Sequence, residues 1–214
     1  MPLELIALIA LTMVDMGHWW EAFALLLMVA FYLRPGEPFR LRVRNLVPPL
    51  ASASGDHRHW ALTMHDFRDE RPSKTGEFDE SLLLDLPPWL FLCRLLAAVV
   101  DSFPATAFLL QTSQTATATA FRLAVQALRL PPSNLYQARH SGASSDFASG
   151  RRSLKEVKRR GRWRSDASLR RYEKAGRLTD QLRRLDPQQQ SAALAAWGAL
   201  PRLLWEQRPA SIRR

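Results

Sequence analysis

Two apolar runs near the start of the printed sequence constrain the fold more than any other feature. They extend from Leu3 to Val14 and from Ala22 to Leu33, and Asp15, His18 and Glu21 separate them. Each run is shorter than the ~20 residues that a helix needs to cross a bilayer. A basic segment and a small-residue cleavage site, which are typical of signal peptides, are not seen. The runs therefore predict two buried helices, over residues 2–13 and 17–33.

The remaining pattern predicts more helices around one small sheet. Residues 60–67 (WALTMHDF) and 81–85 (SLLLD) look like strands, and Pro72 and Gly76 between them are turn residues, which favours a hairpin. Residues 39–47 predict a short helix followed by an extended stretch. Further helices are expected over residues 89–100, 115–130, 134–148, 153–160, 166–174 and 181–206. The expected fold class is mainly α with a small antiparallel β-sheet (α+β).

The positive charge is concentrated in one segment. The 214-residue chain has a net charge of +10, and residues 139–184 contain 15 Lys and Arg against 5 Asp and Glu, which is a local net of +10. The rest of the chain has 15 basic and 15 acidic residues, which cancel. A solvated basic face is the ordinary explanation of such a segment. A polyanionic partner is the alternative, because binding phosphates releases counterions and gives affinity without sequence preference.

A single cysteine excludes any disulfide within the chain. Cys93 lies in an apolar stretch, so it is expected to be a buried core residue of a protein from a reducing compartment.

Four separated segments contain residues suited to chemistry, and each also has an ordinary structural explanation. Arg34 lies in the segment YLRPGE, where it could simply follow a helix end. Lys74 lies in the expected hairpin, where a solvated lysine is common. The segment YQARH (residues 136–140) opens a helix rich in small residues. The segment GRWRS (residues 161–165) precedes Tyr172, which lies nine residues after Trp163.

In order and spacing, these four segments resemble the tyrosine recombinase (phage integrase) family. YLRPGE is similar to the first arginine box of the family, and Lys74 to its β-hairpin lysine. The residues from Tyr136 to Arg139 fall on its His-x-x-Arg box. Trp163 falls on a position held by His or Trp, and Tyr172 on the nucleophile. The separations, 105 residues from Arg34 to Arg139 and 33 from Arg139 to Tyr172, are of the size that the family shows.

The resemblance covers about residues 25–174. It implies the fold of the recombinase catalytic domain over residues 1–176, followed by a C-terminal helical tail over residues 177–214. The tail either packs within its own chain or, as often in the family, on a neighbouring protomer. Family members usually have a helical DNA-clamping domain before the catalytic domain, but here only 33 residues precede Arg34.

The resemblance implies a six-residue active set: Arg34, Lys74, Tyr136, Arg139, Trp163 and Tyr172. Two arginines suit the negative charge that develops on a cleaved phosphodiester, because their planar forks remain charged and donate in pairs. A tyrosine hydroxyl can attack phosphorus if its oxyanion is stabilised, and a lysine can protonate the leaving oxygen. The implied reaction forms a 3′-phosphotyrosyl link and a free 5′-hydroxyl, and it uses no ATP and no metal ion.

Basic residues around these boxes are expected to contact DNA phosphates. The expected DNA-binding residues are His140, Arg151, Arg152, Lys158, Arg159, Arg160, Arg162 and Arg164. A metal site is not expected, because the histidines at 57, 59 and 65 and the carboxylates at 66, 69 and 70 have irregular spacing.

Tyr136 departs from the family, which usually has a histidine there. A histidine can accept a proton near neutral pH, whereas a protonated tyrosine is a poor base. The sequence therefore predicts slow chemistry, and a catalytically degenerate DNA-binding remnant of a mobile element is the alternative. A membrane-surface protein that uses the basic helices is a third hypothesis. The expected partner is double-stranded DNA, with self-assembly on it, no membrane and no nucleotide cofactor, in a nucleus or nucleoid.

Overall fold

The computed structural model describes residues 1–50, 58–64, 81–165 and 176–212. They divide into two compact units, and the first consists of Met1–Phe39 and Leu110–Arg208. The second consists of Arg40–Leu109 and Pro209–Arg214. The described structure is mainly helical with one small antiparallel sheet, which confirms the expected α+β class.

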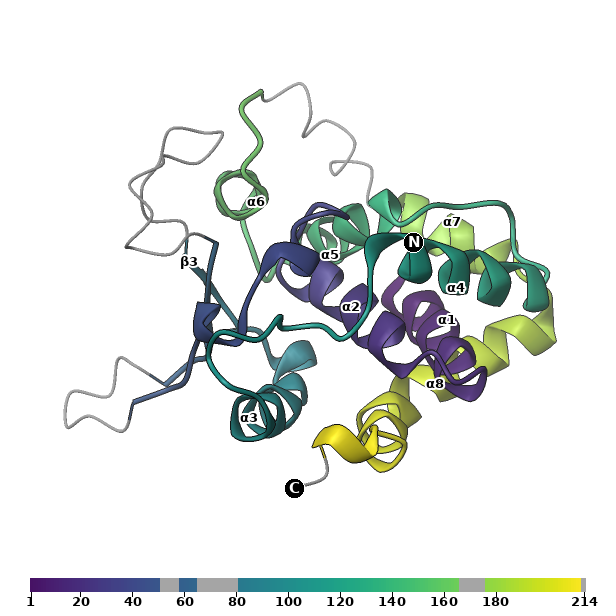
Figure 1. The fold of residues 1–214 in the computed structure, drawn as a ribbon. Helices are drawn as coiled ribbons and strands as arrows, with labels where there is room; N and C mark the ends of the chain where they lie inside the picture. The colour runs from purple at the N-terminus through teal and green to yellow at the C-terminus, as the bar shows by residue number, and fades with distance from the viewer. Residues whose placement is uncertain (51–57, 65–80, 166–175, 213–214) are drawn as a thin grey trace. The chain divides into compact units, whose positions relative to one another are not determined.

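Two N-terminal helices form the centre of the first unit. Helix α1 (Leu3–Asp15) and helix α2 (Trp19–Ala30) are almost entirely buried, as expected for helices that are apolar on all sides. They pack against each other and against α4 (Gln114–Ala127), and α2 also packs against α5 (Tyr136–Ala148) (Figure 1). In the part of the chain that the structure describes, no helix is long and apolar enough to cross a membrane.

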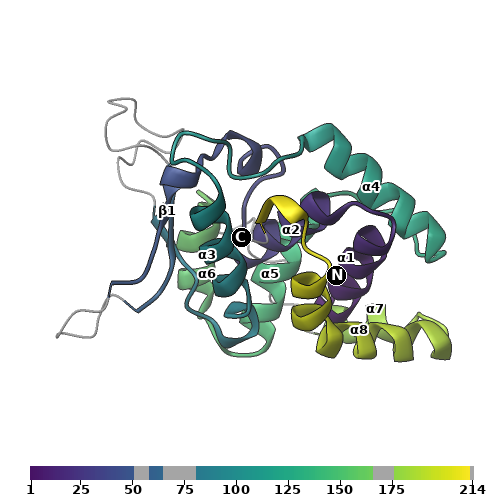
Figure 2. The ribbon, with the colours of Figure 1, turned by 60° about the horizontal axis from the view of Figure 1, so that its bottom comes forward.

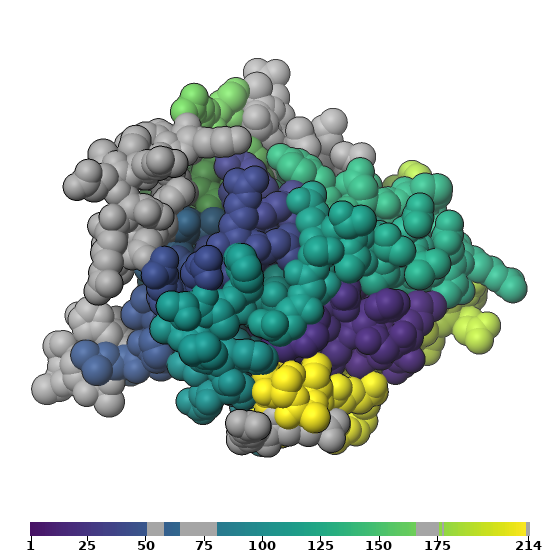
Figure 3. Space-filling view, viewed as in Figure 1, coloured from purple at the N-terminus to yellow at the C-terminus, as the bar shows by residue number. Residues whose placement is uncertain are grey.

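The C-terminal tail folds back on the same unit. It forms α7 (Gly176–Arg183) and α8 (Pro187–Glu206), and α8 lies along α1 (Figure 2). The indole Nε1 of Trp19 donates a hydrogen bond of 2.8 Å to the carbonyl of Leu204 and so joins α2 to α8 as well. Of the two arrangements that the sequence left open, the described structure thus has packing within the chain. Figure 3 shows part of α1 (purple) at the surface next to α4 (teal).

The second unit contains a sheet with the order β1-β2-β3. The expected strands appear in shortened form as β2 (Ala61–Thr63) and β3 (Ser81–Leu83), which pair antiparallel with Leu62 opposite Leu82. The third strand, β1 (Leu46–Val47), comes from the predicted extended stretch. Residues 65–80 between β2 and β3, with Lys74, lie outside the described residues.

Short helical turns and one longer helix complete the second unit. The turns are η1 (Pro38–Arg40, which begins in the first unit), η2 (Val43–Asn45), η3 (Pro87–Trp89) and η5 (Ala210–Ile212). Helix α3 (Leu92–Ser102) packs against η5. Cys93 in α3 is only partly buried, so the prediction of a buried core residue was wrong. Cys93 is the second residue of α3, and the inner face of this helix is occupied by Leu92, Leu95 and Leu96 instead.

The ends of five described helices share one type of turn. In each, a backbone N–H bonds to the carbonyl five residues earlier, and the residue before it has a positive φ, which is the Schellman arrangement. Glycine, which adopts this conformation without steric cost, occupies the position after α1 and α5, at Gly17 and Gly150. Tyr32, Arg129 and Arg162 occupy it after α2, α4 and α6 (Leu154–Gly161), so these three turns carry backbone strain.

Candidate phosphate-binding site

The turn after α2 presents Arg34. Tyr32 reverses the chain, and the backbone N–H of Arg34 then donates a 2.6 Å hydrogen bond to Oε2 of Glu37. The Arg34 Nη1 donates to the other carboxylate oxygen of Glu37 at 3.2 Å. The Arg34 side chain nevertheless remains 39% exposed. A ligand can therefore reach a guanidinium whose direction the turn has already fixed.

Arg139 in the first turn of α5 is buried and only partly satisfied. Its side chain is 1% exposed, and Nη2 donates to the carbonyl of Gly161. Nε and Nη1 are also buried, and neither has a hydrogen-bond partner among the described residues. Buried N–H groups without partners are costly and rare, and at a functional site they point to a ligand that completes them. The donors of Arg139 fit an oxyanion.

Neighbouring cations add to the cost of the Arg139 charge. Burial, together with the charges of Arg162 and Arg34, lowers the pKa of the Arg139 guanidinium to about 10. Arg139 is still protonated at neutral pH. The structure thus brings Arg34 and Arg139, which are 105 residues apart in sequence, close enough to repel each other. An anion placed between them would relieve this repulsion.

Trp163 packs against Arg139 from the end of α6. The guanidinium carbon of Arg139 lies 4.7 Å from the centre of the Trp163 ring, which is a cation–π distance. A Cβ atom at Gly161 would overlap this ring, so only glycine leaves room for it. The sequence prediction that Arg34, Arg139 and Trp163 share one site is consistent with these contacts.

Glu37 joins the first arginine to a further one. Arg162, whose side chain is only 5% exposed, pairs with Oε2 of Glu37 at 2.5 Å. Arg162 was expected to contact DNA phosphates, but in the structure it forms an internal ion pair of the site. Glu37 was not predicted as a site residue, although its position three residues after Arg34 was a usable signal. Arg34 and Arg162 thus share this one carboxylate, and Arg139 lies close enough to feel its charge, which leaves net positive charge at the site.

Two aromatic side chains of α5 extend the site. The Tyr136 ring is 45% exposed and meets the His140 ring edge-on, with 4.9 Å between the ring centres. The His140 ring stacks on Trp163 with 6.0 Å between the centres. Both residues therefore belong to the same group of side chains as Arg139, with an exposed phenol at its rim.

A buried hydrogen bond lies behind the arginines. The hydroxyl of Tyr32 donates to Oδ2 of Asp146 in α5, and both residues are almost completely buried. Burial raises the pKa of the Asp146 carboxyl, although the bond from Tyr32 and the charge of Arg152 lower it. Burial also raises the pKa of Tyr32 well above its usual range, with the Asp146 charge acting in the same direction. This pair was not predicted, because a tyrosine in a turn and an aspartate in a helix carry no signal of contact.

Several other predicted DNA contacts have different positions. Arg152 pairs with Asp146, with 3.7 Å between Nε and Oδ2, and Nη2 of Arg160 donates to the carbonyl of Ala30 at 2.7 Å. These two are largely engaged within the protein. Arg151, Arg159 and Arg164 are exposed, and Lys158 is half-buried. Tyr172 and Lys74 lie outside the described residues.

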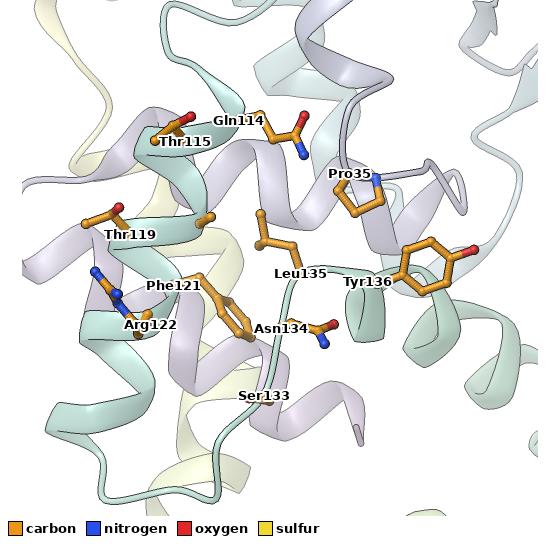
Figure 4. A pocket seen from close by; sticks show the side chains of 11 residues that line it. Pro35, Gln114, Thr115, Thr119, Phe121, Arg122, Ser133, Asn134, Leu135 and Tyr136 are labelled. Carbon is orange, nitrogen blue, oxygen red and sulfur yellow. The ribbon is translucent and has the colours of Figure 1, made fainter.

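A surface pocket of about 470 Å³ adjoins this site (Figure 4). Helix α4 forms one wall with Gln114, Thr119 and Phe121, and the segment that leads into α5 forms another. Pro35 and Tyr136 line the pocket as well. Pro35 directly follows Arg34, and Tyr136 is the first residue of α5, the helix that contains Arg139. A chain-like ligand held by the arginines could therefore continue into this pocket.

A metal centre has no support in the described part of the chain, where no group of three or more His, Cys, Asp or Glu side chains is arranged to hold an ion. The histidine at 59 is described, and those at 57 and 65 are not.

In comparisons with known proteins, no family model, no curated protein and no solved structure matches this chain.

Proposed function

We propose that this protein cleaves and rejoins DNA strands through a 3′-phosphotyrosyl intermediate, with Tyr172 as the nucleophile. The single observation that carries the proposal is the state of Arg139. It is a buried guanidinium with two unpartnered N–H groups, close to Arg34 and packed on Trp163. Residues from three distant segments meet around it, in the combination that the recombinase resemblance implies.

The proposed chemistry depends on charge compensation. As the tyrosine oxygen bonds to phosphorus, negative charge grows on the non-bridging oxygens, and Arg34 and Arg139 donate to them. The bond between phosphorus and the 5′-oxygen then breaks with its electron pair on that oxygen. Lys74 supplies the proton that this oxygen needs. The phosphotyrosyl bond retains the energy of the diester, so a 5′-hydroxyl can attack it and restore the strand.

The exposed basic side chains would hold the DNA on either side of that phosphate. Three of them, Arg151, Arg159 and Arg164, are exposed and belong to the most positively charged part of the sequence. Their contribution would be independent of DNA sequence and would weaken as salt rises. The pocket beside Tyr136 and Pro35 offers space for the nucleotide next to the bound phosphate.

A suicide substrate tests the proposal. The full chain is incubated with a library of DNA duplexes of different sequence, each with a nick close to the cleavage position. Denaturing gels then show whether protein is covalently linked to DNA. We expect an adduct that disappears in Tyr172→Phe and falls at least ~100-fold in Arg139→Lys, because a point charge replaces the donor fork. If DNA is retained on a filter but no duplex gives an adduct, the protein binds DNA without cleaving it.

A further inference from the structure

The hydrogen bond between Tyr32 and Asp146 links the two segments that supply the arginines. Tyr32 lies two residues before Arg34 in the turn after α2. Asp146 lies in α5, seven residues or about two helical turns after Arg139. The bond from the Tyr32 hydroxyl to Asp146 Oδ2 is therefore a direct connection between the Arg34 turn and the Arg139 helix.

The backbone at Tyr32 is an unusual place for a large side chain. Its φ is +54°, and it occupies the position of the Schellman turn at which glycine is most frequent. A residue with a Cβ atom is strained there, and such strain persists only where the surroundings hold the residue in place. Glycine would form the same turn without strain but would have no hydroxyl. The strain is thus the cost of placing a phenol at this point.

The phenol of Tyr32 is fully buried among side chains of α5, α6 and the turn after α6. A Cβ atom at Gly142 in α5 would lie 3.0 Å from two ring carbons of Tyr32, so the ring lies directly on that helix. The guanidinium of Arg160 lies 5.2 Å from the centre of the ring, and Trp163 lies 6.3 Å from it between ring centres. Asp146 accepts from Tyr32 on Oδ2, while its buried Oδ1 has no partner among the described residues.

We propose that Tyr32 and Asp146 are positioning residues that fix the distance between Arg34 and Arg139, so that both guanidinium groups bind one phosphate. This inference rests on the proposed function of the arginine pair. Neither residue touches the phosphate itself. Loss of the bond frees the Arg34 turn from the Arg139 helix. The affinity of the arginine pair for an anion then falls.

Titration with inorganic phosphate tests the inference without any cleavage of DNA. The full ¹⁵N-labelled chain is titrated, and the side-chain Nε–H signals of Arg34 and Arg139 are followed by NMR, with each signal assigned from its Arg→Lys variant. In the unmodified protein, both signals should move with one common dissociation constant. In Tyr32→Phe, we expect binding about tenfold weaker, which is the effect of one lost hydrogen bond, and unequal responses of the two signals.

Two further variants separate positioning from stability. Asp146→Asn keeps an acceptor oxygen for the Tyr32 hydroxyl, so its phosphate affinity should stay within about twofold of the unmodified protein. Thr117→Val is the matched control, because Thr117 in α4 is also fully buried and its hydroxyl also donates a hydrogen bond, to the Ser113 carbonyl. It should lose stability in urea by an amount similar to Tyr32→Phe but keep its phosphate affinity.

The outcomes are distinct. If the unmodified protein shows no response at Arg34 and Arg139, the proposed phosphate site is wrong, and the inference is wrong with it. If phosphate binds but Tyr32→Phe binds it equally well, only the positioning role is overturned. If Tyr32→Phe does not fold, the double variant Tyr32→Phe, Asp146→Leu is used, because it leaves neither partner of this hydrogen bond buried alone, although it also removes the Asp146–Arg152 ion pair. That variant should show the same tenfold loss, and unchanged affinity would overturn the inference.

Discussion

Substitution of Gly142 by alanine should destabilise the protein by pushing apart the helices that carry the site. Gly142 lies in α5, and a Cβ atom there would overlap the carbonyl oxygen of Val29 in α2 and would lie 3.0 Å from two ring carbons of Tyr32. A backbone carbonyl cannot rotate away as a side chain can, so the helices must separate. Gly142 therefore sets the distance at which α5 packs on α2.

The magnitude follows from two opposing effects. Alanine is favoured over glycine in a helix by roughly 0.5–1 kcal/mol, and overpacking of a tight interface costs about 1–3 kcal/mol or more. The overlap with Val29 involves backbone, so we expect the upper part of that range and a net loss of about 2 kcal/mol. For a chain of this size, such a loss lowers the melting temperature by roughly 4–8 °C.

Gly198→Ala provides the matched control. Gly198 lies within α8, and a Cβ atom there would have no heavy atom within 4 Å outside the helix and its chain neighbours. This substitution should stabilise the protein by roughly 0.5–1 kcal/mol, because only the helix preference acts. Both variants are measured by urea unfolding and thermal melting. If Gly142→Ala is as stable as Gly198→Ala, the close approach of α5 and α2 does not exist as described, and the geometry of the site must be reconsidered.

Three further predictions concern buried groups. Arg139→Met should abolish phosphate binding, yet leave the free energy of unfolding in urea unchanged or higher by about 1–2 kcal/mol, because it removes a buried charge whose Nε and Nη1 have no hydrogen-bond partner among the described residues. A strongly destabilised variant would contradict this. The pKa of Asp146 is raised in the folded protein, so between the ordinary carboxyl pKa and the raised value the folded state binds more protons than the unfolded state. The free energy of unfolding, relative to that of Asp146→Asn, should therefore fall as pH rises through this window. An equal pH dependence of the two proteins in urea unfolding would refute the prediction. Burial raises the pKa of the Cys93 thiol, so less of it is the reactive thiolate at pH 8. Iodoacetamide should therefore alkylate Cys93 about tenfold more slowly in the folded protein than in urea. Equal rates would count against the partial burial.

The sequence predicted the helical elements well, because their apolar periodicity is a local property. Helix α1 ends at Asp15, two residues later than expected, whereas α2 is shorter than expected and ends at Ala30 instead of continuing to Leu33. The stretch from Phe31 to Leu33 is apolar because it is buried in the turn. Apolar pattern alone could not show this, since a tyrosine is not a usual residue for a helix-ending turn.

The candidate site was predicted only in part. Arg34, Arg139 and Trp163 were found because each lies in a segment with a recognisable pattern, and the structure brings them together. The burial of Arg152, Arg160 and Arg162 was not foreseen. A cluster of arginines in a sequence looks like a solvated or DNA-facing surface, and only the three-dimensional packing shows which members bond to carbonyls and carboxylates of their own chain.

The non-glycine residues at the helix ends differ in how readily their strain could be removed. Glycine at Tyr32, Arg129 or Arg162 would relieve backbone strain of about 1 kcal/mol at each position. At Arg129, such a change would cost little else, since that side chain is exposed. At Tyr32, it would also remove a fully buried aromatic side chain, which costs about 3–5 kcal/mol, together with the bond to Asp146. At Arg162, it would remove the bond to Glu37. Selection for heat resistance would therefore favour glycine at Arg129 and retain the strained tyrosine at position 32.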